Sequence, residues 1–417
     1  MDPVYLGKGV VLDGGLGSSR PNDNQIVFGG TGSGKSYSIV LPTLAHMENS
    51  SFIATFAKRS VVDSAMAFFR KKGYRTILWN LANPGPGDAV PDPFDYMRDE
   101  SDLDDLAKQI ASSNPRLQHS GADPYWEESA EGLMSGCLRY VRETSVFPSM
   151  RKVIDFFYKI RLTEKGQKAI ASTVDGDIER LAAKKPSSVA VRKLCAFTGL
   201  PYATGSCVRD TLDKNIQTVF PSAVQNAMKK DGYVDFRRLA AEKTALFILT
   251  SPSRPTQYAF ANMMFGIAIR ELTEFAESRP SGRLPLDVKL IFDDFSCGFP
   301  IRDYERTIST FRAAGISALM LCQSLSQLDA TFGADKATVI LDNVSSLVYM
   351  PGSMNKKTCA FISEMVNMPL DDVMFMPVGS VIIFRTGVKP TITRRYDTMS
   401  DPLCRELMSA EDSREIG

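Results

Sequence analysis

The stretch "QIVFGGTGSGKSYSIVLP", residues 25–42, joins an apolar run to a glycine-rich turn and a Lys-Ser pair. It fits the pattern G-x-x-x-x-G-K-[ST], with Gly29, Gly34, Lys35 and Ser36 at the defined positions. Glycines let backbone N–H groups converge on phosphate oxygens, because no side chain stands in the way. The stretch therefore predicts a strand, a phosphate-binding loop and a helix, in that order.

The Lys-Ser pair indicates which chemistry the loop serves. In such a loop the lysine reaches the β and γ phosphates, and the hydroxyl supplies an oxygen to Mg²⁺. We expect Lys35 to act on the phosphates of ATP and Ser36 to bind Mg²⁺. The other residues of the predicted nucleotide-binding loop are Gly29, Gly30, Thr31, Gly32, Ser33 and Gly34. The alternative is a glycine turn that only closes a strand–helix junction.

Short apolar runs rich in β-forming residues recur along the chain, and most are separated by segments with helical spacing. They occupy residues 25–28, 51–56, 76–81, 245–251, 288–294, 316–322, 346–350 and 380–384. This alternation predicts an α/β domain with a mainly parallel sheet. Between residues 86 and 240 the pattern becomes helical, as in "PYWEESAEGLMSGCLRYVRE". We predict a nucleotide-binding domain of residues 1–85 and 241–417, interrupted by an all-α insertion domain of residues 86–240.

Charge is unevenly distributed along a chain whose formal net charge is only +1. Residues 82–150 carry an excess of acidic side chains, and residues 151–242 carry an excess of basic ones. The near-neutral total excludes a polycation wrapped around nucleic acid, but it leaves room for a local basic face. Two interpretations stay open: the basic half contacts DNA or an acidic partner, or both halves are solvated helical surfaces.

The seven cysteines are scattered without a C-x-x-C pair, and the chain has two histidines. This pattern favours reduced thiols in a cytosolic protein over a zinc site or a disulfide framework. The longest apolar stretch near a helix, at residues 259–269, is shorter than the roughly 20 residues that cross a bilayer. We therefore expect no signal peptide and no transmembrane segment.

A P-loop needs a carboxylate that holds Mg²⁺ at the end of a neighbouring strand. "VKLIFDDF", residues 288–295, supplies it: a buried run is followed by Asp293 and Asp294. We expect Asp293 to serve the metal and Asp294 to orient or deprotonate the attacking water. Gln323 ends another apolar run, where its amide can align the γ-phosphate. Arg312 lies between these two runs and is a candidate for charge stabilisation across a subunit boundary, although exposed arginines more often serve as surface cations.

Four segments together resemble the TraG-type coupling ATPases of conjugation and type IV secretion. They are "NQIVFGGTGSGKSYSIVLPTL", "DPYWEESAEGLMSGCLRYV", "IFDDFSCG" and "FRAAGISALMLCQSLSQLDATFG". The similarity spans residues from about 20 to 390. The segment from Arg312 to Gly333 and the Asp-Pro-Tyr-Trp segment make it more specific than a P-loop alone.

The resemblance implies a RecA-like P-loop ATPase domain with an all-helical insertion, assembled as a homohexamer at the cytoplasmic face of the inner membrane. It also implies transfer of a relaxase with single-stranded DNA, or a protein cargo, to the conjugative channel. Its other expected partners are the channel ATPase and the inner-membrane components of the secretion system. Lys35 and Ser36 match the family's phosphate and Mg²⁺ residues. Asp293 matches its metal-side carboxylate, and Gln323 its third nucleotide motif.

The sequence departs from the family pattern in three places. Family members usually carry an N-terminal membrane anchor, whereas this sequence starts almost directly before the P-loop domain, so an anchor was trimmed or the protein is an anchorless relative. The family's Asp-Pro-Lys-Gly reads "TFAKRS" at residues 55–60, which keeps Lys58. The usual Asp-Glu pair is Asp293-Asp294, so the second carboxylate is one methylene shorter and turnover is open to question.

Three functions are compatible with these observations. The first is an ATP-driven motor that moves single-stranded DNA or a DNA–protein cargo. The second is a docking receptor that ATP gates with little hydrolysis, which the Asp-for-Glu replacement favours. The third is a DNA pump of the FtsK or HerA type outside secretion, which the Asp-Pro-Tyr-Trp segment disfavours.

Overall fold

The computed structural model describes residues 2–12, 22–113, 123–165, 168–171, 174–251, 254, 256–297, 300–352 and 354–409. The chain divides into two compact units. The first, called the sheet unit, comprises residues 1–82, 234–255 and 268–417, and the second, called the helical unit, comprises residues 83–233 and 256–267. That each unit is a separate domain stays a prediction, as do the predicted domain bounds.

The sheet unit is built on nine strands in the order β13-β12-β11-β3-β10-β9-β4-β8-β5, with a separate hairpin of β1 and β2. Neighbours from β11 to β5 pair in parallel, whereas β12 and β13 are antiparallel. The strands are β1 (Val4–Gly7), β2 (Val10–Leu12), β3 (Gln25–Gly29), β4 (Ser51–Phe56), β5 (Arg75–Asn80), β8 (Thr244–Leu249), β9 (Val288–Phe292), β10 (Ile316–Cys322), β11 (Ser346–Met350), β12 (Ser380–Arg385) and β13 (Val388–Arg394).

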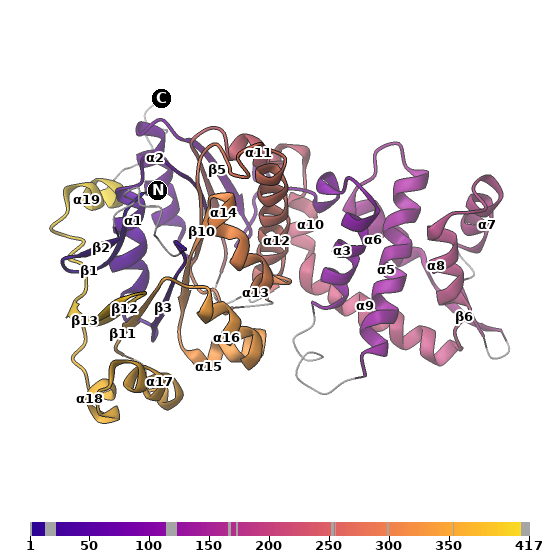
Figure 1. Cartoon of the computed structure of the whole chain (residues 1–417). Coiled ribbons are helices and arrows are strands. Elements are labelled where there is room, and N and C mark those ends of the chain that lie inside the picture. Colours follow the sequence, from indigo (N-terminus) through magenta and orange to yellow (C-terminus); the bar gives the residue numbers. More distant parts are fainter. Residues whose placement is uncertain are drawn as a thin grey trace. The chain divides into compact units, whose positions relative to one another are not determined.

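Helices cover both faces of this sheet (Figure 1), as expected for parallel strands that are buried throughout. The helices of the sheet unit are η1 (Ser36–Val40), α1 (Leu41–Ala45), α2 (Arg59–Lys71), α11 (Phe236–Leu239), α13 (Tyr304–Thr307), η4 (Ile308–Thr310), α14 (Phe311–Ala314), α15 (Leu325–Phe332), α16 (Ala334–Asp342), α17 (Lys356–Val366), α18 (Leu370–Met374) and α19 (Pro402–Ser409). Helix α12 (Thr256–Glu277) begins in the helical unit and ends in the sheet unit.

One continuous apolar core lies between the sheet and α1, α2 and α19. Phe52 and Phe247 project from adjacent strands onto Phe69 of α2, with ring centroids 4.8 and 6.2 Å from that ring. Each fully buried phenylalanine contributes about 2–3 kcal/mol through the hydrophobic effect. This packing fixes the strands whose ends carry the polar residues described below.

The helical unit contains the predicted insertion. Its elements are η2 (Pro93–Tyr96), α3 (Glu100–Ala111), α5 (Tyr125–Thr144), α6 (Met150–Lys159), β6 (Leu162–Lys165), β7 (Lys168–Ala171), α7 (Asp175–Lys184), α8 (Val189–Thr198), α9 (Tyr202–Val219), α10 (Ser222–Ala227) and η3 (Lys230–Gly232). Strands β6 and β7 form an antiparallel hairpin, so the insertion is mainly rather than wholly helical. Each strand has only four residues, too few for a pattern of alternation to stand out in the sequence.

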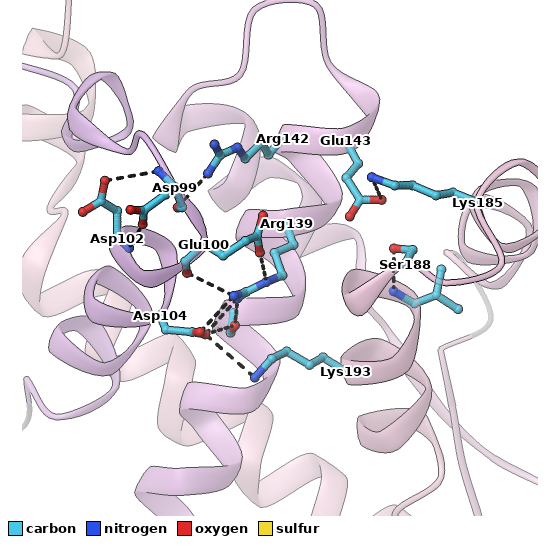
Figure 2. Close-up of polar contacts among 12 residues, drawn as sticks. Asp99, Glu100, Asp102, Asp104, Arg139, Arg142, Glu143, Lys185, Ser188 and Lys193 are labelled. Carbon is cyan, nitrogen blue, oxygen red and sulfur yellow. Dashed lines mark hydrogen bonds and ion pairs between the residues drawn. The ribbon is translucent and has the colours of Figure 1, made fainter.

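A buried arginine joins the first two long helices of this unit (Figure 2). The Arg139 side chain on α5 is 4% exposed, and its Nε lies 2.7 Å from Glu100 Oε2 of α3. Its Nη1 lies 2.9 Å from Asp104 Oδ1, and it also bonds Ser135. Burial opposes the charge, but hydrogen bonds from Arg139 and Ser135 hold the pKa of Asp104 below its usual range. We call Arg139, Glu100, Asp104 and Ser135 the arginine cluster.

Two lysines of the basic half pair with carboxylates of the acidic half. Lys193 of α8 lies 4.0 Å from Asp104, and Lys185 lies 3.4 Å from Glu143 of α5. The charge separation seen in the sequence is therefore partly neutralised inside the unit.

Among the described residues, no helix combines the length and the apolar character that crossing a bilayer requires.

Candidate nucleotide-binding site

The glycine-rich loop follows β3, which lies between β10 and β11 near the middle of the sheet. A Cβ built on Gly29 would lie 2.6 Å from Ser33 Oγ and 3.0 Å from Met350 Cβ, so any larger residue there would force Ser33 and Met350 to shift. Gly32 and Gly34 have φ of 78° and 88°, a conformation that side chains with a Cβ rarely adopt. The sequence requirement for glycine is thus a steric requirement of the loop.

The loop continues into η1 and then α1, and together they span residues 36–45. The first turn is closed by Ser38 N–H, which donates to the Gly34 carbonyl over 2.8 Å. The first N–H groups of a helix have no partner within the helix, and the helix dipole favours an anion beside them. The predicted strand–loop–helix order is present, with a wide π-helical first turn.

Lys35 is held inside the loop that it is predicted to serve. Its Nζ lies 2.5 Å from the Gly29 carbonyl oxygen and 3.2 Å from that of Gly30, and the residue is 8% exposed. Burial lowers the pKa of Lys35, although the nearby carboxylates of Asp294 and Asp293 act in the opposite direction. The ammonium group therefore stands among acceptors but without a salt bridge among the described residues, and an anion in the loop would stabilise its charge.

Asp293 leaves the end of β9 and meets the helix that starts at Ser36. The Ser36 Oγ donates to Asp293 Oδ1 over 2.7 Å, and the Asp293 N–H donates to Thr55 Oγ1 over 2.9 Å. Burial raises the pKa of Asp293 to about 6, while the Ser36 hydrogen bond and Lys35 act to lower it. The two oxygens of Ser36 and Asp293 form an adjacent pair of hard ligands, which suits Mg²⁺.

Asp294 has φ of 75°, so a residue other than glycine adopts the left-handed region directly after Asp293. Such strain persists only where the surroundings over-determine it, and it concentrates at functional sites. Gln323, at the end of β10, points its Nε2 toward Asp294 Oδ1 at 3.5 Å, a long and weak contact.

The structure brings together five of the predicted side chains: Lys35, Ser36, Asp293, Asp294 and Gln323. Their strands β3, β9 and β10 run parallel, so their carboxyl ends meet at one edge of the sheet. Arg312 lies elsewhere: α14 precedes β10, whereas Gln323 follows it, so the length of that strand separates the two residues. The Arg312 side chain is exposed, and its role toward a neighbouring subunit stays a prediction.

Thr55 belongs to this site but is absent from the sequence prediction. It is the second-last residue of the buried strand β4, and it accepts a hydrogen bond from the Asp293 N–H of a neighbouring segment. A hydroxyl near the end of an otherwise apolar run was the only signal that could have indicated it.

A family model described as Type IV secretory system Conjugative DNA transfer matches residues 1–368. The chain belongs to this family. The resemblance to TraG-type coupling proteins of type IV secretion is confirmed. Among the curated proteins, none matches the chain significantly.

Three solved structures share the fold of this coupling protein. TrwBdeltaN70, a bacterial conjugative coupling protein in complex with sulphate, has a TM-score of 0.65 at 15% identity, over 89% of this chain and 85% of that chain. Plasmid coupling protein TrwB in complex with ADP and Mg²⁺ has a TM-score of 0.66 at 16% identity, with the same coverage of both chains. VirB4 of Thermoanaerobacter pseudethanolicus has a TM-score of 0.58 at 12% identity, over 96% of this chain and 97% of that chain. The predicted RecA-like α/β fold with a helical part is confirmed.

Proposed function

We propose that this coupling protein is an ATPase whose turnover drives the transfer of a DNA or DNA–protein cargo into a type IV secretion channel. The observation that carries the proposal is the meeting of Lys35, Ser36 and Asp293 with Asp294 and Gln323 at one edge of the sheet. A lysine in a glycine loop, a hydroxyl beside a carboxylate and a second carboxylate are the parts that phosphoryl transfer from ATP uses.

Each side chain has a distinct role in this proposal. Residues Gly29 to Ser36 cradle the phosphates, and Lys35 binds the β and γ phosphates. Ser36 and Asp293 hold Mg²⁺, which would neutralise charge on the phosphate oxygens. Asp294 accepts a proton from the water that attacks the γ-phosphate, and Gln323 aligns that phosphate. Charge on the transferred group is further stabilised by Arg312 of a neighbouring copy, if the copies assemble as a ring.

The proposed biological setting is the one expected for a member of this family. We propose a homohexamer at the cytoplasmic face of the inner membrane, with a relaxase bound to single-stranded DNA as its cargo. The channel ATPase and inner-membrane components are its other proposed partners. TrwB structures with ADP and Mg²⁺ and with a non-hydrolysable ATP analogue support the choice of nucleotide and metal.

Steady-state ATP hydrolysis with and without single-stranded DNA tests the proposal. We expect DNA to stimulate turnover, and Lys35→Ala to reduce it at least about 100-fold. Lys71→Ala, an exposed lysine on α2, is the matched control and should behave as the native protein. If Lys35→Ala hydrolyses ATP as fast as the native protein, an ATPase at this site is contradicted. The same holds if the native protein binds no nucleotide.

The second candidate is a docking receptor that ATP gates without sustained hydrolysis. It is favoured by Asp294, whose side chain is shorter than the family's Glu and whose contact with Gln323 is long. In that case the native protein binds ATP but does not turn it over, and Asp294→Glu increases turnover. Under the ATPase proposal Asp294 already suffices, so the same substitution brings no gain.

A further inference from the structure

The chain segment that follows β13 passes along the glycine-rich loop. The Arg395 N–H donates to the Gly379 carbonyl over 2.9 Å, which continues the β12–β13 pairing. Three residues later, Thr398 Oγ1 donates to the carbonyl of Tyr37, the residue after Ser36, over 2.8 Å. The segment is therefore anchored on both sides of Arg395, once to the hairpin and once to the helix that starts the nucleotide site.

The Arg395 guanidinium lies directly against Gly34. A Cβ built on Gly34 would stand 3.1 Å from Arg395 Nη1, and Gly34 already has the positive φ that excludes most side chains. Arg395 is exposed, and within the described ranges its side chain makes no hydrogen bond or ion pair. A cation thus stands over the loop residue that precedes Lys35, with its donors available to a ligand.

We propose that Arg395 binds the α and β phosphates of the nucleotide from within the same chain. This inference rests on the proposed nucleotide site. Arginine presents a planar fork of N–H donors that matches phosphate oxygens, and its charge is permanent. The backbone of such a loop cradles the α and β phosphates, whereas Asp294 and Gln323 gather at the ends of β9 and β10. Arg395 therefore serves binding of di- and triphosphates alike, and it differs from Arg312, whose predicted role is in a neighbouring copy.

The test is equilibrium binding of fluorescent ATP and ADP in the presence of Mg²⁺, followed by anisotropy. We expect Arg395→Ala to raise the Kd of both nucleotides about tenfold, the loss of one charged hydrogen-bonded contact. Arg395→Lys keeps the charge but not the fork, so its loss is smaller. Arg394→Ala is the matched control, because Arg394 is also exposed and successive side chains of a strand point to opposite faces.

The outcomes separate this inference from the function on which it rests. If the native protein binds neither nucleotide, both fail. If it binds both nucleotides and Arg395→Ala equals Arg394→Ala, the inference fails and the ATPase proposal stands. A loss confined to ATP overturns the α and β assignment. A second readout is thermal unfolding: without nucleotide all variants should melt as the native protein does, and with ADP the stabilisation should shrink in Arg395→Ala alone.

Discussion

The nucleotide site and the arginine cluster both remove a cation from water, but they treat it differently. Arg139 meets two carboxylates and a hydroxyl, and its partners Glu100 and Asp104 remain 65% and 49% exposed. Within the part of the chain that the structure describes, Lys35 bonds only the backbone carbonyls of Gly29 and Gly30, while the neighbouring Asp293 bonds Ser36 and has a raised pKa. A cluster whose charges are already satisfied stabilises a fold. A cluster whose charged side chains do not form ion pairs with one another can bind a charged ligand.

The largest effect should come from removing the second carboxylate. Asp294→Asn keeps the size of the side chain, and asparagine tolerates the left-handed backbone that this position requires. We expect turnover to fall about 1,000-fold, the scale of a lost general base, with ATP affinity unchanged. Turnover and nucleotide anisotropy measured on one preparation check this. Retained turnover would show that Asp294 is not the base.

The next effect is structural and belongs to the helical unit. Arg139→Ala removes the side chain that joins α3 to α5, and we expect a loss of about 3 kcal/mol in the free energy of unfolding. The chain has two tryptophans, so Trp126 fluorescence in a Trp79→Phe background reports on this unit during urea unfolding. Arg139→Lys, which keeps the charge, should lose less. An unchanged midpoint would remove the contrast between the two clusters.

A pH series distinguishes the two clusters, because the pKa of Asp293 is raised in the folded protein whereas the pKa of Asp104 is lowered. The pKa of Asp293 is about 6 in the folded protein and 3.8 as its ordinary value, so the folded state binds the proton more tightly. The contribution of Asp293 to stability therefore falls as the pH rises from about 4 to about 6, and stays low above that. Asp293→Asn lacks this dependence and should be about 3 kcal/mol more stable than the native protein at pH 8. Urea unfolding from pH 4.5 to 8, followed by Trp79 in a Trp126→Phe background, measures the difference. A constant difference across this range would contradict the pKa shift.

The smallest effect concerns the lysines that neutralise the acidic half. Lys185 is 57% exposed, so Lys185→Ala should cost only about 0.5 kcal/mol in the Trp126 assay. Because Lys185 and Lys193 already face Glu143 and Asp104, we expect either alanine variant to change single-stranded DNA affinity less than twofold. A larger loss would favour the alternative in which the basic half contacts DNA.

A site residue could be predicted from the sequence where it directly follows a strand that the sequence also predicts. Asp293 and Gln323 follow buried runs directly, and parallel strands bring their ends to the loop after β3. Arg312 shows the limit of this reasoning, because a residue before a strand lies at the opposite edge of the sheet. The sequence alone does not state which copy of the chain it would face.

The remaining site residues depend on contacts between distant segments. Thr55 contacts Asp293, 238 residues later in the chain, because β4 pairs with β9. Arg395 reaches Gly34 only because the antiparallel β12–β13 hairpin returns the chain to the loop. Strand β13 has mostly exposed side chains and lacks the apolar run that marked the other strands. Local sequence patterns do not show which distant segments meet, so the position of Arg395 beside the loop became visible only in the structure.

Strand β13 also determines how the sheet ends. It is the outermost strand, and Pro390 offers no N–H to a further strand, while the exposed Lys389 and Arg394 place positive charge along the same border. The irregular pairing between Ile383 and Arg385 adds a local twist to the hairpin. A proline, positive charges and an irregular register on an outermost strand all disfavour pairing with a strand of another copy of the chain.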